Sequence, residues 1–259
     1  SDSSGNAATP KTVVYTWKVD TTAPVFIGLP AATASYQCAG DVPQTASVTA
    51  NDNCDGIVPV SVSTTVNGSP CNMTITHTWT AVDSCGNSNV FTQVITIKDT
   101  IAPVIGTLPT GSDLGCNPAE LPTDASVKLL VHATDNCGAA IINVSHVDST
   151  SGCTVTRTFT ITASDTCNNV SQAAVVVYSW KADTTAPVMS GLPAATASYQ
   201  CMNDVPSAPT VTANDDCDGA LVPTFKETQS GTACNLTITR TWTVSDTCGN
   251  VATFTQTIT

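Results

Sequence analysis

The chain is poor in basic side chains. Its 259 residues include 8 Lys and Arg against 20 Asp and Glu, a formal net charge of −12 at pH 7. Such an excess of negative charge repels phosphate backbones and anionic headgroups, so we expect no nucleic-acid partner and no acidic membrane partner. The sequence also lacks an apolar run long enough to cross a bilayer. We therefore expect no membrane insertion.

The residue types that most often carry acid–base catalysis are also scarce. Glu120 and Glu227 are the only glutamates, so no glutamate pair is available for glycoside chemistry. No Ser/His/Asp or Cys/His arrangement recurs, no CxxC pair occurs, and the three histidines occupy unrelated positions: His77, His132 and His146. These absences argue against a zinc–thiolate site and against catalysis. We expect the protein not to be an enzyme.

Cysteine, by contrast, is abundant and periodic. The chain has twelve cysteines in three sets of four, and each member of the first set recurs 163 residues later. The sets are Cys38, Cys54, Cys71 and Cys85; Cys116, Cys137, Cys153 and Cys167; and Cys201, Cys217, Cys234 and Cys248. A fixed period of this kind predicts a tandem array rather than one large domain.

A proline motif marks where each repeat begins. DTTAP or DTIAP occurs once ahead of each cysteine set. The predicted domains are repeat 1 (residues 20–98), repeat 2 (residues 99–182) and repeat 3 (residues 183–259). The stretch VVYTWKVDTTAP at 13–24 resembles VVYSWKADTTAP at 176–187. We therefore expect residues 1–19 to hold the last strand of a preceding, missing repeat.

Alternating β-branched residues predict strands. Stretches such as MTITHTWTAV (73–82) and LTITRTWTV (236–244) have a period of two, and nothing longer than a turn has a helical period. In repeat 1 we predict strands at 24–38 (broken by GLP at 28–30), 46–51, 58–66, 72–82 and 90–98. The predicted fold class is all-β, with three tandem Ig-like β-sandwich modules in a linear array. Trp79 and Trp242 lie on the predicted inner face, so we expect core residues rather than platforms for sugars.

Four cysteines in each repeat predict two disulfides in each, formed in an oxidising compartment. A module of about 80 residues buries too little surface to be very stable without them. If neighbouring strands are antiparallel, the first and third cysteines lie at one end of a repeat and the second and fourth at the other. We therefore predict pairing within each repeat. The predicted bonds are Cys38–Cys71, Cys54–Cys85, Cys116–Cys153, Cys137–Cys167, Cys201–Cys234 and Cys217–Cys248.

Several motifs in fixed order resemble a known family. NDNCDG, TITRTWT, SDTCGN and DTTAP are similar to the HYR-like, Ig-like repeats of very large Bacteroidetes cell-surface proteins, such as SprB-type gliding-motility adhesins. The resemblance implies secretion, display on the cell surface and a non-catalytic role as a stalk or adhesive filament. Repeat 2 departs from the pattern, because it reads DNCGAA and has Ile161 at the position of Trp79.

Aspartates gather at the same predicted end of each repeat. Eighteen of the twenty acidic residues are Asp, and many flank the second and fourth cysteines or open the proline motif. Gathered carboxylates repel unless a cation neutralises them, and Ca²⁺ prefers such loop oxygens. The predicted Ca²⁺ ligands are Asp20, Asp52, Asp55 and Asp83; Asp99, Asp135 and Asp165; and Asp183, Asp215, Asp218 and Asp246. The simpler interpretation is that these side chains only form Asx-turns.

These patterns favour an extracellular spacer that presents an adhesive tip, and they leave alternatives open. The main alternative is a carbohydrate-binding accessory module of a secreted protein, with surface polysaccharide or glycan as its partner. Threonine rows such as residues 74–80 could order ice, although a solvated strand face explains them more simply. We expect a linear monomer whose partners are neighbouring repeats of its parent chain. Residues 12–19 should find no neighbouring strand in repeat 1.

Overall fold

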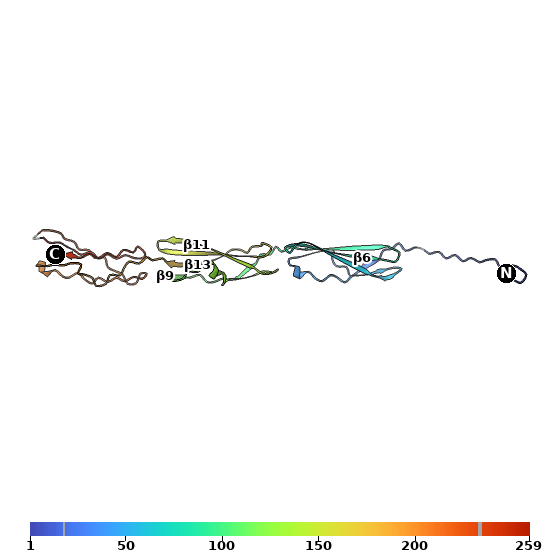
Figure 1. Ribbon diagram of the computed structural model, residues 1–259, viewed down its shortest axis with the longest axis horizontal. Helices are drawn as coiled ribbons and strands as arrows, with labels where there is room; N and C mark the ends of the chain where they lie inside the picture. Colours follow the sequence, from blue (N-terminus) through green and yellow to red (C-terminus); the bar gives the residue numbers. More distant parts are fainter. Residues whose placement is uncertain (18, 233–234) are drawn as a thin grey trace. The chain divides into compact units, whose positions relative to one another are not determined.

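The computed structural model describes residues 1–17, 19–232 and 235–259 (Figure 1). The described chain separates into two compact units. Unit 1 consists of Ser1–Ile101 and Asn136–Gly138, and unit 2 of Ala102–Asp135 and Ala139–Thr259. Repeat 1 thus falls in unit 1, and most of repeats 2 and 3 fall in unit 2. The boundaries of the three repeats remain predictions.

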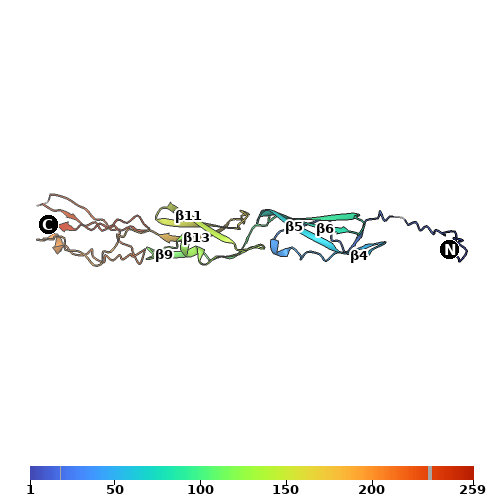
Figure 2. The ribbon, with the colours of Figure 1, turned by 45° about the vertical axis from the view of Figure 1, so that its right-hand side comes forward.

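The chain is all-β, as the alternating sequence predicts. In unit 1 the strands form a three-stranded sheet in the order β1-β3-β4 and a four-stranded sheet in the order β2-β7-β6-β5. Figure 2 shows β4 apart from β5 and β6. The strands are β1 (Val25–Ile27), β2 (Thr33–Tyr36), β3 (Thr49–Asp52), β4 (Gly56–Val58), β5 (Val60–Ser69), β6 (Asn72–Val82) and β7 (Ser88–Ile97), with a 3-10 turn at Ala39–Asp41.

Strand directions in unit 1 follow from the turns. β5 and β6 pair antiparallel along the whole of β5, and β6 pairs antiparallel with β7. β2 runs parallel to β7, so the chain begins and ends the sandwich in the same direction. The predicted strand at 24–38 is divided at the GLP motif, as expected: β1 ends at Ile27, and Gly28 has a φ of +83°. A second predicted strand is divided where no break was predicted. The strand at 58–66 breaks at Pro59, which has no N–H to donate and lies between β4 and β5.

The tryptophans of repeats 1 and 3 lie in the core. Trp79 is 1% exposed and Trp242 is 3% exposed, which confirms the prediction from the alternation. Neither ring is available as a platform for a sugar. A neighbouring buried cluster in unit 1 consists of Ala50, Val58 and Ala81.

Unit 2 contains one larger sheet and two small ones. The larger sheet has the order β11-β12-β13-β9, with β9 parallel to β13; β10 pairs with β8, and β14 with β15. The elements are β8 (Val104–Thr107), β9 (Asp113–Cys116), α1 (Asp124–Lys128), β10 (His132–Thr134), β11 (Ile141–Ser151), β12 (Thr154–Ser164), β13 (Ala174–Lys181), a 3-10 turn (Met202–Asp204), β14 (Ile238–Thr239) and β15 (Thr257–Ile258).

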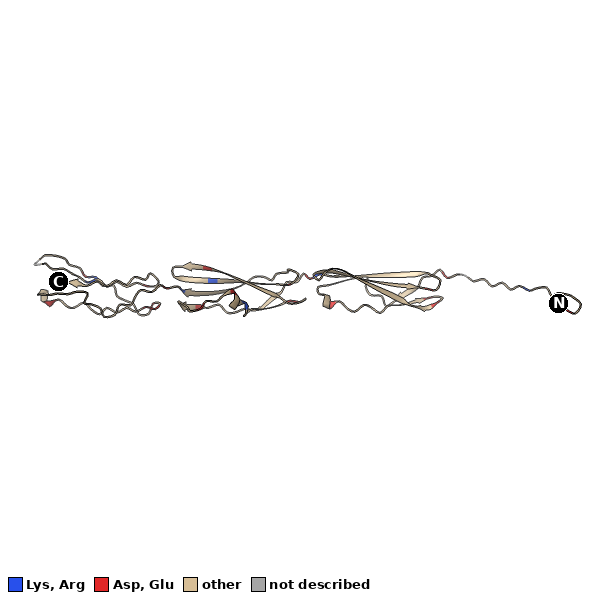
Figure 3. Ribbon diagram, in the orientation of Figure 1, with Lys and Arg blue, Asp and Glu red and all other residues tan. Residues whose placement is uncertain are grey.

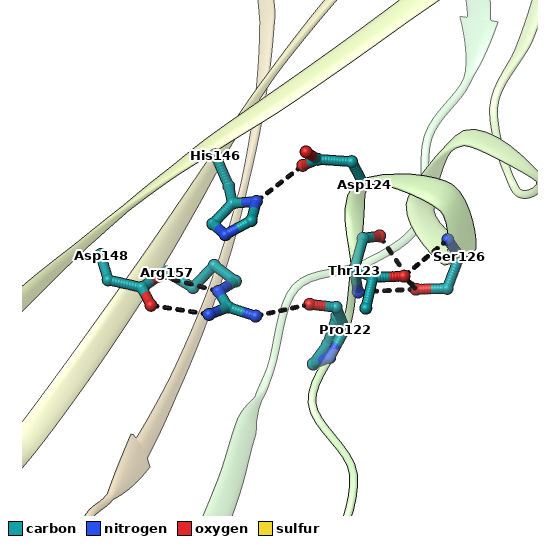
Figure 4. Close-up of polar contacts among 7 residues, drawn as sticks. All are labelled: Pro122, Thr123, Asp124, Ser126, His146, Asp148 and Arg157. Carbon is teal, nitrogen blue, oxygen red and sulfur yellow. Dashed lines mark hydrogen bonds and ion pairs between the residues drawn. The ribbon is translucent and has the colours of Figure 1, made fainter.

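A short helix completes the core of repeat 2. The Thr123 hydroxyl accepts a hydrogen bond from Ser126 N at 3.1 Å, and the Ser126 hydroxyl accepts one from Thr123 N at 2.8 Å (Figure 4). This reciprocal cap satisfies backbone donors at the start of α1. Val127, 1% exposed, then packs with Phe159 and Ile161. In repeat 2, which has Ile161 in place of the tryptophan, a side chain from helix α1 thus contributes to the core.

The segment before repeat 1 stands apart from the sheets. Residues 12–17 and 19 form no strand, and Tyr15 and Trp17 are 80% and 82% exposed. This agrees with the expectation that the segment finds no neighbouring strand in repeat 1; Lys18 lies outside the described residues. Within the described part of the chain, no helix is both long enough and apolar enough to cross a membrane.

Candidate functional site at the repeat ends

Disulfides join cysteines of consecutive repeats. Cys71 and Cys167 each take part in a disulfide. Among the described cysteines, Cys54, Cys85 and Cys201 are free and exposed, and Cys234 lies outside the described residues. The bonds whose two partners the structure defines are Cys38–Cys137, Cys116–Cys217 and Cys153–Cys248, with Cα–Cα distances of 5.1, 5.8 and 5.6 Å. These distances are usual for disulfides.

The predicted pairing within each repeat is therefore wrong. The first cysteine of a repeat bonds to the second cysteine of the next repeat, and the third bonds to the fourth. Strand direction does separate first and third from second and fourth, but cysteines at one end do not pair with each other. The structure contradicts five of the predicted bonds: Cys38–Cys71, Cys54–Cys85, Cys116–Cys153, Cys137–Cys167 and Cys217–Cys248. In the sixth predicted bond, Cys201–Cys234, the described partner Cys201 is free.

The end of repeat 2 shows why the bonds form in this way. Strand β13 ends at Lys181, which lies in register with Cys116 on the parallel strand β9. The Lys181 carbonyl accepts a hydrogen bond from Asn117 N at 2.9 Å, and Ala182 N donates to Cys153 O at 2.8 Å. Cys116 and Cys153 thus flank the point where the chain leaves repeat 2.

The start of repeat 3 presents the two partner cysteines at the same point. Asp183, two residues after the end of β13, has a carboxylate oxygen within 4.8 Å of both Asp246 and the sulfur of Cys248. The hydroxyl of Thr184 donates to Asn250 Oδ1 at 2.7 Å. Because so few residues separate the two repeats, the cysteines at the end of one meet those at the start of the next.

The aspartate before each fourth cysteine forms a closed turn. Asp83 Oδ1 accepts hydrogen bonds from Cys85 N at 2.9 Å and Asn87 N at 2.8 Å, and its Oδ2 accepts one from Asn87 Nδ2 at 2.7 Å. The same Asp–Asn contact recurs between Asp165 and Asn169 and between Asp246 and Asn250. The Asx-turn interpretation accounts for these three aspartates.

A second aspartate ties two cysteine-bearing turns together. Asp55 accepts hydrogen bonds from Ser84 N at 2.6 Å and from the Ser84 hydroxyl at 3.0 Å. Asp218 accepts the corresponding bond from the hydroxyl of Thr247. In both repeats the turn with the second cysteine is thereby held against the turn with the fourth.

Asp20 and Asp52 form a carboxylate cluster in unit 1. Asp52 is 4% exposed, and its Oδ1 accepts from Cys54 N at 2.8 Å and Asp55 N at 3.0 Å. Its Oδ2 is buried with no hydrogen-bond partner among the described residues. Ligand atoms of Asp20, Asp52 and Cys54 lie within 4.8 Å of one another. A buried carboxylate oxygen without a donor is costly, and it fits a cation ligand.

Unit 2 holds the corresponding cluster. Carboxylate oxygens of Asp183, Asp215 and Asp218 lie within 4.8 Å of one another. Asp183 Oδ1 accepts from Thr185 N at 2.6 Å, whereas its Oδ2 is buried with no hydrogen-bond partner among the described residues. Lys181 Nζ lies 3.3 Å from Asp218 Oδ1 and supplies part of the compensating charge. Lys and Arg, whose positions are coloured blue on the ribbon of Figure 3, are few along the chain.

The set predicted in repeat 2 is divided between the units. Asp99 belongs to unit 1, whereas Asp135 and Asp165 belong to unit 2. Asp99 and Asp165 are buried, and Asp99 Oδ1 accepts a hydrogen bond from Ile101 N at 3.1 Å. The structure therefore defines candidate clusters within a unit only for repeats 1 and 3.

Hydrogen bonds and charge set the titration of these groups. The hydrogen bond from the Thr22 hydroxyl lowers the pKa of Asp20. Loss of solvation, followed by the charge of Asp20, raises the pKa of the Cys54 thiol. The hydrogen bond from Thr247 lowers the pKa of Asp218, with a smaller contribution from Lys181. The partly buried Asp20 and Asp218 are thus carboxylates at neutral pH.

One polar cluster was not predicted from the sequence. His146 Nδ1 lies 2.7 Å from Asp124 Oδ1, and Arg157 contacts both oxygens of Asp148 at 2.7 and 2.6 Å (Figure 4). Arg157 also donates to Pro122 O at 2.8 Å. Asp148 and Arg157 lie opposite each other in the β11–β12 hairpin. The sequence could have predicted their ion pair only if the pairing register of the two strands had been known. The cluster joins the α1 segment to the sheet.

The comparison with protein families matches the two outer repeats. The family model described as an HYR-like domain with four cysteines matches residues 27–97 and 192–259. The two matches together cover more than half of the chain. The intervening stretch, unmatched by the model, contains the repeat that departs from the motif pattern. No curated protein matches the chain.

Proposed function

Because the chain belongs to the family of HYR-like domains with four cysteines, we propose that it is a tension-bearing stalk segment of a cell-surface adhesin. The family match and the disulfides support an extracellular, adhesion-type repeat module. The observation that carries the stalk is the pairing of cysteines between consecutive repeats rather than within them.

These disulfides give a pulling force a short covalent route. Force that reaches Cys137 through Cys38 passes along the backbone to Cys116 and then through sulfur to Cys217. The backbone from Cys116 to Cys137 spans 21 residues. Fully extended, it reaches roughly 75 Å, whereas a whole repeat of about 80 residues reaches roughly 280 Å. Most of each repeat is therefore protected from extension even if its core unfolds.

Single-molecule pulling tests the stalk. Oxidised chains should lack the extension steps of roughly 280 Å expected for whole repeats, and a reducing agent should restore them. The matched control is the same molecule before and after reduction, since its core residues do not change. Full-length steps in the oxidised chain would contradict the proposed force path.

We further propose that Ca²⁺ binds the two carboxylate clusters. Asp183 supplies a buried oxygen without a hydrogen-bond donor, and Asp215 and Asp218 supply oxygens beside it. In unit 1 the buried oxygen without a donor belongs to Asp52, and Asp20 supplies a second carboxylate beside it. A dication would offset the repulsion between these carboxylates, with backbone carbonyls and water completing 6–8 ligands. Because Asp20 and Asp183 are the first residues of their repeats, the ion would hold the start of each repeat against its cysteine-bearing turns.

Thermal melts of the oxidised protein in Ca²⁺ and in EDTA test this site. Ca²⁺ at 100 times its Kd should stabilise the folded state by about 2.7 kcal/mol. The variant Asp183→Asn/Asp215→Asn should lose the part of the shift that arises in unit 2. Asp41→Asn, at an exposed position outside the clusters, should keep all of it. Coincident curves in Ca²⁺ and EDTA would rule out the calcium site.

Gliding motility or surface attachment is the proposed setting, with surface polysaccharide or glycan as the partner of the parent adhesin. The support is the motif resemblance together with the absence of a repeated catalytic arrangement in the sequence. Glycan-array binding by this chain alone would place recognition in these repeats. Absence of binding would place it elsewhere in the parent protein.

A further inference from the structure

We propose that the end of repeat 1 bearing Cys54 and Cys85 is a disulfide docking surface for another four-cysteine repeat. It would bond to the first and third cysteines of that repeat. A second copy of this chain can supply them as Cys201 and Cys234. The oxidised chain would therefore assemble head to tail, which revises the expectation of a monomer.

The positions of the cysteines within the repeats carry this proposal. Cys54 and Cys85 are the second and fourth cysteines of repeat 1, and both are exposed and free. Their equivalents in repeat 3, Cys217 and Cys248, are bonded to the first and third cysteines of repeat 2. Cys201, the first cysteine of repeat 3, is also exposed and free. The described residues thus present both thiols of one half of the joint and one thiol, Cys201, of the other half; Cys234 lies outside the described residues.

The hydrogen bond that accompanies the disulfide between repeats 1 and 2 is already present at the free Cys54. Asn53 Nδ2 donates to Cys54 Sγ at 3.1 Å. In the bond between Cys38 and Cys137, the equivalent Asn136 donates to both sulfurs, at 3.2 and 2.9 Å. The contacts between Asp55 and Ser84 described above hold the Cys54 turn against the Cys85 turn. The surface therefore needs little rearrangement to accept a partner.

An independent observation points to the same partner. Residues 13–24 resemble residues 176–187, with ten of twelve residues identical, and within the latter stretch β13 pairs with β9 and β12. Those two strands border Cys116 and Cys153. Residues 12–17 and 19, by contrast, form no strand and expose large apolar side chains. A strand segment typical of a repeat end and two thiols typical of a repeat start thus adjoin one another.

The bond chemistry balances with a disulfide oxidant. For each new bond, one cysteine thiolate attacks oxidised glutathione and displaces one glutathione thiol. The thiolate of the other cysteine then attacks the mixed disulfide and displaces the second. The two protein thiols lose two electrons and two protons, and one oxidised glutathione becomes two reduced molecules.

Oxidation of the purified chain with oxidised glutathione tests the proposal. Non-reducing gels should show a ladder of multiples that a reducing agent collapses, and peptide mapping should find Cys54 joined to Cys201. A bond between Cys54 and Cys85 of one chain, a bond between two Cys54 residues, or a monomer capped by glutathione would overturn it.

Complementary variants sharpen the test. Chains with Cys54→Ser/Cys85→Ser and chains with Cys201→Ser/Cys234→Ser should each remain monomeric alone. Their mixture should stop at a dimer, because each contributes one half of the joint. Ser63→Ala, at an exposed position of β5, should leave the ladder unchanged. Circular dichroism of each variant separates loss of the joint from loss of the fold, and a folded mixture that forms no dimer overturns the proposal.

Discussion

Removing one bond between repeats 2 and 3 should destabilise unit 2 by a calculable amount. The change is Cys153→Ala/Cys248→Ala, which leaves Cys116–Cys217 in place. With that bond present, the loop closed by Cys153–Cys248 has about 68 residues. In the chain-entropy model, opening such a loop costs about 4.4 kcal/mol at 25 °C. For a unit of this size the melting temperature should fall by roughly 9–18 °C.

The same variant distinguishes the two pairing schemes by counting thiols. If the bonds join repeats, both partners of one disulfide are removed and no thiol is exposed. If the bonds lie within repeats, Cys116 and Cys217 lose their partners and two new thiols appear. A thiol reagent under denaturing conditions measures the difference directly. The matched control, Cys116→Ala/Cys153→Ala, should release thiols from Cys217 and Cys248 or allow those two to re-pair.

Two results together would refute this reasoning. One is the appearance of two additional thiols in Cys153→Ala/Cys248→Ala. The other is a melting temperature within about 2 °C of that of the parent protein, because a loss of even 2 kcal/mol should lower it by about 4–8 °C. The first would restore pairing within repeats. The second would show that the denatured chain is not constrained by this bond.

Three further changes test the packing and the turns. Trp79→Ala should cost about 3–5 kcal/mol in urea unfolding because the ring is buried, whereas Trp17→Ala, at an exposed position, should change stability by less than about 0.5 kcal/mol. Asn87→Ala removes an amide hydrogen bond to a buried carboxylate and should cost about 1.5–3 kcal/mol; unchanged unfolding would contradict the closed turn. The hydrogen bond from Arg157 lowers the pKa of Asp148 in the folded protein below its usual value of 3.8. The stabilisation that this contact gives the folded state is therefore present above pH 3.8 and is lost as the pH falls through the pKa of the folded protein. Asp148→Asn should therefore flatten the acid limb of a melting-temperature curve between about pH 2 and 5, and an unchanged curve would refute this.

Local pattern was enough to predict the long strands of repeat 1, whereas the alternating stretch at 236–244 in repeat 3 contains only the short strand β14 (Ile238–Thr239). β6 begins and ends where the alternation predicts, at Asn72–Val82, because a period of two directly encodes one buried face. The same alternation identified Trp79 as a core residue. The positions of the strand breaks needed only local chemistry, since Gly28 has a positive φ and Pro59 lacks an N–H. Repeats and strands are therefore sequence-level properties of this chain.

The turns around the cysteines are also local. The Asp83–Asn87 contact spans four residues, so an Asx-turn could be read from the motif alone. The cluster of Asp183, Asp215 and Asp218 is not local, because more than thirty residues separate Asp183 from the other two. Sequence placed these aspartates at one end of a repeat, but it could not tell which oxygens the turns already satisfy. That distinction depends on burial and on donors supplied by other segments.

Cysteine pairing is the feature that most clearly could not be predicted from the sequence. Repetition and alternation along the chain were enough to predict the tandem repeats, the strand directions and hence the end of the repeat at which each cysteine lies. It did not determine the partner, because pairing depends on distances between ends of different repeats. Only the tertiary structure brings Cys116 beside Cys217 and Cys153 beside Cys248. A disulfide requires Cα atoms within about 4.4–6.8 Å, and the short linker, not the strand pattern, provides that approach.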